Sequence, residues 1–127
     1  MSTKEYELPH DAIGREIGII SPHEFGDSEG FIIYFTDGTS LEIEDDPDCC
    51  EVRWMHTDDD LDYYAGSTLM GVELRDGPTV DGACGEVEET MFLLITTSLG
   101  VVTIAAHNNH NGYYGGISPH YTLKGKP

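Results

Sequence analysis

The longest apolar segments of the chain are only five residues long, and this restricts the folds that it can adopt. The two segments are Phe31–Phe35 and Met91–Ile95, and each is soon followed by residues typical of turns. Short apolar segments between turn residues are typical of β-strands, whereas a helix that crosses a membrane needs about 20 apolar residues. We therefore expect a β-sheet protein that makes no membrane contact.

One hairpin is indicated with particular clarity. Phe31–Phe35 and Ser40–Glu44 flank Thr36-Asp37-Gly38-Thr39, and an Asp-Gly pair tolerates the positive φ angles of a tight turn. In the second arm, Leu41 and Ile43 alternate with Glu42 and Glu44. Successive side chains of a strand point to opposite faces, so one face of this hairpin is expected to be wet.

The remaining elements follow from the same kind of pattern. We expect further strands at Ala12–Ile20, Leu69–Arg75, Met91–Thr97, Val101–Ala106 and near Ile117–Leu123, with Met91–Thr97 covered on both faces. Thr57–Gly66 is expected to form one short helix, and Glu24–Gly30, Asp76–Glu89 and His107–Gly116 are expected to be loops. The prediction is a single α+β domain over residues 1–127, with a core at about 12–123. It consists of a twisted antiparallel sheet of about five to seven strands and one short helix.

The charge distribution indicates the kind of partner. The chain has 24 acidic and 6 basic residues, for a net charge of −18, and residues 37–62 hold 11 of the acids with Arg53 as their only base. Such a surface repels nucleic acid and attracts cationic groups. We expect no direct nucleic-acid binding, and a protein partner with a basic surface that contacts Glu42, Glu44, Asp58, Asp59, Asp60 and Asp62. The alternative is that the acids only maintain solubility.

The cysteines suggest reduced thiols. There are three, Cys49, Cys50 and Cys84, and the first residues show no apolar run typical of a secretory signal, so we expect a cytoplasmic protein. A zinc site formed by Cys49, Cys50, His107 and His110, with His56 or His120 as further ligands, is an alternative because thiolate and imidazole suit zinc. Adjacent cysteines do not easily direct both sulfurs to one ion. We therefore expect no cofactor, with buried thiols and solvent-facing histidines.

The segment His107–Gly116 is a second candidate site. Asn109 and Asn111 supply donors and acceptors, Tyr113 and Tyr114 supply stacking faces, and the glycines allow close approach to a ligand. A nucleotide signal is one such ligand, although the chain has few cations to bind phosphate. The alternative is that Asn111-Gly112 simply turns the chain.

No motif indicates an enzyme. The sequence contains no Gly-x-Ser-x-Gly, no Walker A loop and no Gly-x-Gly-x-x-Gly. Asp58, Asp60 and Asp62 are spaced like the start of a calcium loop, but Tyr63 and Leu69 stand where the glycine and the closing glutamate are required.

Three motifs together resemble a known family. The hairpin around Thr36–Thr39, Asp48-Cys49-Cys50-Glu51 and Asn111-Gly112-Tyr113-Tyr114 resemble a small domain of unknown function found widely in bacteriophage and prophage genomes, over residues 12–121. The insertion Asp76–Glu89 and the histidines His107 and His110 depart from its pattern. The family has no established activity to transfer, so the resemblance implies a phage origin.

These observations favour one function and leave three alternatives. The leading hypothesis is a non-enzymatic phage accessory protein in the host cytoplasm that binds a host or phage partner through its acidic face, for counter-defence or host takeover. The alternatives are a binder of a nucleotide signal at His107–Gly116, a zinc-binding domain or metal-dependent hydrolase, and a structural component of the virion.

Overall fold

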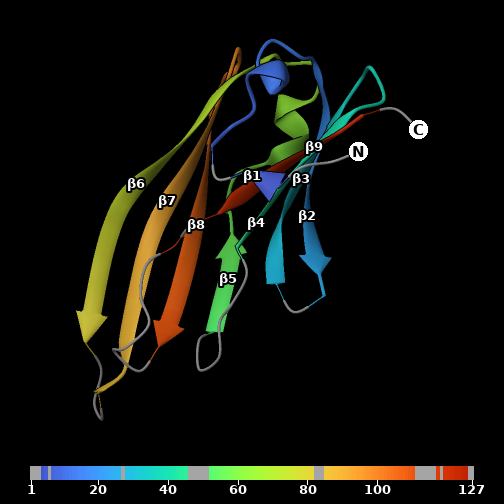
Figure 1. Ribbon diagram of the computed structural model, residues 1–127. Coiled ribbons are helices and arrows are strands. Elements are labelled where there is room, and N and C mark those ends of the chain that lie inside the picture. Colours follow the sequence, from blue (N-terminus) through green and yellow to red (C-terminus); the bar gives the residue numbers. More distant parts are fainter. Residues whose placement is uncertain are drawn as a thin grey trace.

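The protein consists of two facing antiparallel sheets (Figure 1). The computed structural model describes residues 4–5, 7–26, 28–45, 52–81, 85–110, 117 and 119–125. Within these residues the strands are β1 (Lys4–Glu5), β2 (Ile17–Phe25), β3 (Ser28–Phe35), β4 (Ser40–Asp45), β5 (Val52–His56), β6 (Leu69–Asp81), β7 (Val87–Thr97), β8 (Gly100–His110) and β9 (His120–Lys124). Two 3₁₀ turns, η1 (His10–Ala12) and η2 (Leu61–Tyr64), complete the described elements.

The strand order joins segments that are distant in the sequence. One sheet has the order β1-β9-β4-β3-β2, and the other has the order β5-β8-β7-β6. Every pairing is antiparallel. The late strand β9 therefore lies beside β4, and β5 lies beside β8.

The predicted α+β class is wrong, because the described residues form a nearly all-β protein. The expected helix at Thr57–Gly66 is only the four-residue turn η2. Before η2, the Thr57 hydroxyl donates to the carbonyl oxygen of Thr103 and the Asp59 carboxylate accepts from its amide. Strand β5 ends at His56, and beyond it these two side chains bond to β8 in place of a paired strand. Residues 57–60 therefore follow the edge of the sheet. Neither 3₁₀ turn in the described chain has the length or apolarity needed to span a membrane.

The predicted strand count is also wrong, since there are eight strands of five or more residues and the two-residue β1 in the described part of the chain. Three segments expected to be loops contain strand residues. Glu24 and Phe25 end β2, Ser28–Gly30 begin β3, and Gly26 between the two strands has φ 69°. Asp76–Asp81 continues β6 past a bulge, and His107–His110 continues β8. Pairing with neighbouring strands overrides the polar composition of these segments.

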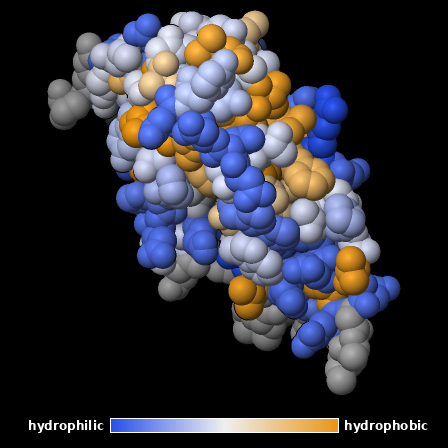
Figure 2. All heavy atoms as spheres, turned by 180° about the vertical axis from the view of Figure 1, so that it is seen from behind, coloured by the Kyte–Doolittle hydropathy of each residue, from blue (hydrophilic) through white to orange (hydrophobic). Residues whose placement is uncertain are grey.

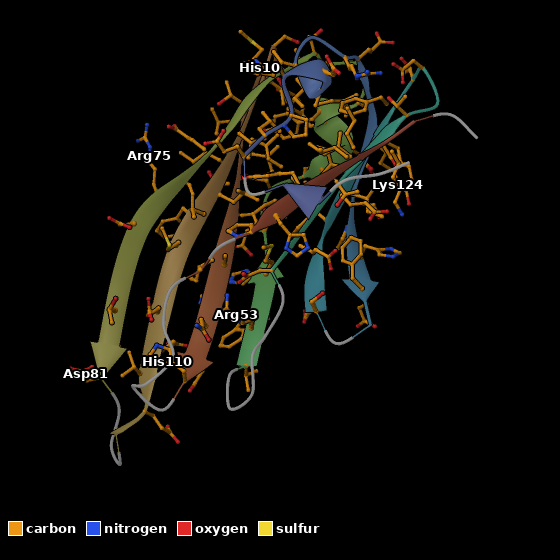
Figure 3. The ribbon with its side chains drawn as sticks, viewed as in Figure 1. His10, Arg53, Arg75, Asp81, His110 and Lys124 are labelled. Carbon is orange, nitrogen blue, oxygen red and sulfur yellow. The ribbon has the colours of Figure 1, made fainter. Side chains whose placement is uncertain are left out.

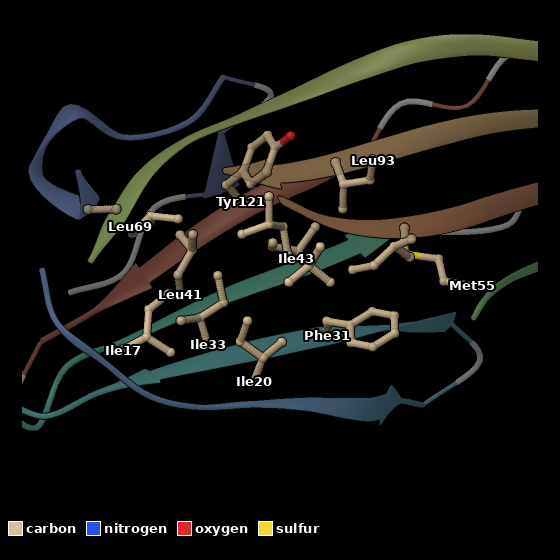
Figure 4. Packing of buried hydrophobic residues seen from close by; sticks show 14 of the residues in the cluster. Ile17, Ile20, Phe31, Ile33, Leu41, Ile43, Met55, Leu69, Leu93 and Tyr121 are labelled. Carbon is tan, nitrogen blue, oxygen red and sulfur yellow. The ribbon is translucent and has the colours of Figure 1, made fainter. Parts of the chain in front are cut away.

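The core lies between the two sheets (Figure 4). Leu41 and Ile43 of β4 face Leu93 of β7 and Ile104 of β8, and all four side chains are completely buried. The expectation that Met91–Thr97 is covered on both faces is wrong, because buried and half-exposed residues alternate along β7 from Phe92 onwards. One face of the four-stranded sheet is therefore open to solvent.

The hairpin predicted at Thr36–Thr39 is confirmed. β3 pairs with β4 across the turn, and Gly38 has φ 90°. The Asp37 carboxylate accepts hydrogen bonds from the hydroxyl and amide of Thr39 and from Arg15. These bonds, those from Thr39 first, hold the pKa of Asp37 at about 2, so the turn keeps its anchor at any pH well above that value.

The two sheets are joined at one end. Residues 66–69 run antiparallel to residues 15–17: the amide of Gly66 donates to the carbonyl of Ile17, the amide of Ile17 to Ser67, and the amide of Leu69 to Arg15. This short bridge fixes the start of β6 beside the start of β2.

Two long strands form free edges. β2 is the outer strand of one sheet and β6 of the other, and each contains a proline, Pro22 and Pro78. Proline lacks the amide hydrogen of a ladder, so in sheets it is confined to edge strands and bulges. Pro78 lies within the bulge between Asp76 and Thr79.

Candidate functional site

The acidic residues predicted to contact a partner fall into two separate groups. Glu42 and Glu44 lie on β4, and each side chain is only 15% exposed. Lys124 Nζ is 2.8 Å from Glu42, while His120 Nε2 and the Ser28 hydroxyl are 3.0 and 2.9 Å from Glu44. The four aspartates lie beside the other sheet, three of them between β5 and η2 and Asp62 within η2, and all are exposed. The structure therefore does not bring the six carboxylates together on one face.

The segment Asp58–Tyr63, here called the acidic loop, is held in place by its own hydrogen bonds. The Asp59 carboxylate accepts from the Thr103 amide at 2.7 Å, and the Asp60 carboxylate accepts from the Asp62 amide at 3.2 Å. Tyr63 is 60% exposed. The carboxylates of Asp58, Asp60 and Asp62 therefore lie beside an exposed aromatic ring on a fixed loop.

Tyr64 anchors the end of the acidic loop. Its ring lies within 4 Å of the position that a β-carbon would take at Gly100, and its hydroxyl donates to the Val101 carbonyl at 3.3 Å. Burial, followed by the charge of Asp59, raises the pKa of the Tyr64 phenol, so the donor proton is retained. Leu99 and Val101, both exposed, therefore border the acidic loop.

Of the predicted zinc ligands in the described residues, His107 and His110 do not converge, whereas His56, named as a further ligand, lies beside His107. His107 and His110 both lie on β8, where His107 pairs with Trp54 and Thr90, and His110 pairs with Val87. They are three residues apart, so they point to opposite faces of the sheet. Cys49 and Cys50 lie outside the described residues. In the part of the chain that the structure describes, no three side chains of His, Cys, Asp or Glu gather as a metal cluster.

The first four residues of the predicted ligand-binding loop, His107–His110, belong to strand β8. Asn109 belongs to β8 and, with Val80, Glu86 and Glu88, lines a hollow of about 210 Å³. Asn111, Tyr113 and Tyr114 lie outside the described residues.

A layer of buried polar side chains lies on the inner face of the four-stranded sheet. Arg53 Nη1 of β5 is 2.7 Å from Asp45 Oδ1 of β4, and the two side chains are 8% and 3% exposed. On β8, Asn108 is completely buried, and His110 Nε2 is 2.6 Å from Glu89 Oε1. Figure 3 shows Arg53 and His110 on adjacent strands of this sheet. The Arg53–Asp45 pair therefore ties one sheet to the other.

The outer face of the same sheet carries an arrangement that the sequence did not reveal. Trp54, His56, Thr90 and His107, here called the imidazole strip, lie side by side on β5, β7 and β8. Trp54 stacks on His107 with ring centroids 4.8 Å apart, and His56 Nε2 is 3.0 Å from His107 Nε2. His107 Nδ1 is 3.1 Å from the Thr90 hydroxyl. The only signal in the sequence is that Trp54 and His56 are two residues apart, which places them on the same face of a strand. Their position beside His107 becomes apparent only when β5 is paired with β8.

The imidazole strip predicts a pH-dependent stability. Desolvation, followed by the nearby His56, lowers the pKa of His107 below 6.5, while Glu88 opposes this shift. The unfolded chain therefore binds a proton at this residue near pH 6.5, whereas the folded chain binds it only at lower pH, so stability falls as the pH falls below 6.5. Between pH 8 and pH 5, the free energy of unfolding measured by urea denaturation should fall less for His107→Gln than for the wild type. Equal losses would contradict this assignment.

These features define a two-sheet β-sandwich with an acidic loop and an open outer sheet face. The chain belongs to the family described as a domain of unknown function, DUF7448, whose model matches residues 10–118. The expected membership of a family of unknown function is thereby confirmed. No curated protein and no solved structure shows a match to the chain.

Proposed function

We propose that this protein is a non-enzymatic binding protein that contacts a partner with a basic surface through its acidic loop. The proposal rests on one observation: four carboxylates within residues 58–62 are exposed, and none of the ion pairs among the described residues involves them. Glu42 and Glu44 are not part of the proposed surface, because both already face basic side chains on their own sheet.

Three physical arguments support this surface. An excess of negative charge increases the rate of encounter with a cationic partner and fixes its orientation. Exposed tyrosines such as Tyr63 are frequent anchors at the centres of interfaces. The hydrogen bonds of Asp59 and Asp60 hold the loop in one conformation, which lowers the entropy lost on binding.

The surroundings of the acidic loop fit a protein partner better than a small molecule. Leu99 and Val101 add exposed apolar area beside the carboxylates. Elsewhere, as Figure 2 shows for the rear of the molecule, apolar residues reach the surface in separate patches between hydrophilic ones. With a net charge of −18, direct binding to nucleic acid is not part of the proposal.

A biological setting completes the proposal. The resemblance to a domain common in phage genomes supports a phage origin, and hence action in the host cytoplasm on a host or phage protein. Counter-defence and host takeover are roles that require binding alone, with no chemistry from this chain.

The proposal predicts a loss of binding when the acidic loop is neutralised. Affinity capture from host lysate should recover a partner with the wild type and lose it with the triple variant Asp58→Asn, Asp60→Asn, Asp62→Asn. Asparagine still caps η2 at position 60, so the loop conformation is retained. Tyr63→Ala should weaken binding about tenfold or more. Recovery should also fall as NaCl is raised, because salt screens exposed charges.

A matched control distinguishes the effect of neutralising the acidic loop from the effect of changing the net charge of the chain. The triple variant Glu73→Gln, Asp76→Asn, Asp81→Asn removes the same charge from exposed positions on β6. The partner should still bind this control. Equal loss with both triple variants, equal retention by both, or no specific partner of the wild type would contradict the proposal.

A further inference from the structure

The side chains of His56 and His107 meet nitrogen to nitrogen. Their ring planes differ by 5° and their centroids are 5.1 Å apart, while the two Nε2 atoms are 3.0 Å apart. A centroid separation so much larger than the nitrogen separation means that the rings lie end to end in nearly one plane. The two Nε2 atoms therefore face one small volume on the solvent side of the sheet.

The neighbouring groups indicate how protons are distributed in this pair. The Thr90 hydroxyl lies 3.1 Å from His107 Nδ1, and a hydroxyl at this distance is able to accept a proton from that nitrogen. With the proton on Nδ1, the Nε2 atom of His107 has a free lone pair, which accepts the Nε2 proton of His56. Metal-bound histidines usually donate the N–H of their far nitrogen to a carboxylate, a backbone carbonyl or water, and the Thr90 hydroxyl stands in the place of such an acceptor here.

We propose that His56 Nε2 and His107 Nε2 form an open binding site for one divalent transition-metal ion. Metal–nitrogen bonds of about 2.0–2.1 Å at a tetrahedral angle place two ligand nitrogens about 3.3 Å apart, a few tenths of an ångström beyond the distance in this structure. Small rotations of the exposed His56 ring provide the difference. Water occupies the remaining coordination positions.

The chemistry of the ligands selects the ion. Imidazole nitrogen suits Cu²⁺, Ni²⁺ and Zn²⁺, whereas Ca²⁺ and Mg²⁺ prefer oxygen. The ion replaces the proton between the two nitrogens, and neutral His56 carries that proton on Nδ1 instead. The negative net charge of the chain adds a favourable long-range attraction.

The sole tryptophan of the chain provides a reporter. Trp54 stacks directly on His107, so a paramagnetic ion at the proposed site should quench its fluorescence. Protein without a histidine tag, freed of metal by a chelator, is titrated with Ni²⁺ at pH 7.5. We expect saturable quenching at one ion per chain, reversed by Zn²⁺ and not produced by Mg²⁺.

Variants determine whether the two histidines are the ligands. His56→Gln should raise the dissociation constant for Ni²⁺ at least about tenfold, and Thr90→Val should weaken binding about tenfold through the orientation of His107. His23→Gln, a change at an exposed histidine on β2, is the control and should bind like the wild type. The proposal is overturned if His56→Gln binds Ni²⁺ as tightly as the wild type, if His23→Gln weakens binding equally, or if quenching does not saturate by about 1 mM.

Discussion

Gly30→Ala should lower the free energy of unfolding by about 3 kcal/mol or more, at the upper end of the range for overpacked cores. Gly30 lies on β3, an inner strand of the five-stranded sheet, between His23 of β2 and Glu44 of β4. A β-carbon at this position would overlap the carbonyl oxygen of Ile43 and would lie 3.0 Å from the Glu44 Cα. Both obstacles are backbone atoms of a paired strand, so no side-chain rotation relieves them. Urea denaturation measures the loss.

Gly71→Ala is the matched control for this prediction. Gly71 also lies in a strand, β6, but its added β-carbon would meet no atom within 4 Å. The free energy of unfolding of Gly71→Ala should stay within about 0.5 kcal/mol of the wild-type value. If the two variants unfold at the same urea concentration, the close approach of β3 to β4 at Gly30 is wrong.

Arg53→Met should destabilise the protein by about 3–5 kcal/mol, the usual cost of removing one partner from a buried ion pair. Asp45 is 3% exposed, so without the guanidinium its carboxylate faces a medium of low dielectric constant between the sheets. Methionine keeps most of the apolar stem of arginine, so the loss reports on charge more than on volume. Denaturation in urea at pH 7 gives the value.

A double-mutant cycle tests that the loss arises from the pair. Arg53→Met combined with Asp45→Asn should be less destabilised than the two single variants predict together, because the double variant buries neither charge of this ion pair. Strict additivity of the two losses would show that Asp45 and Arg53 do not interact across the sheets.

The sequence predicts local structure well where a short segment determines it. The hairpin of β3 and β4 needs only two apolar strands and the Asp-Gly turn, and these lie within 15 residues. The sequence does not predict the strand at His107–His110, because its polar residues gain their partners from β5 and β7, which lie elsewhere along the chain. The capping residues predict a helix where only the short turn η2 forms, because they do not show that Thr57 and Asp59 bond to Thr103.

The candidate sites show the same division between local and long-range information. The exposure of Asp58–Asp62 follows from local composition, but their separation from Glu42 depends on which sheet each segment joins. The imidazole strip depends on a register in which Trp54 pairs with His107, across a sequence separation of more than 50 residues. No spacing rule within one segment predicts such a pair.

The prolines at the two free edges have a consequence for behaviour at high concentration. A second copy that added a strand beside β2 or β6 would meet Pro22 or Pro78, where no backbone donor is available. The hydrogen bonds to an added strand would be interrupted at Pro22, in the middle of β2, or at Pro78, towards the end of β6. Fibril growth through β2 and β6 is thereby discouraged.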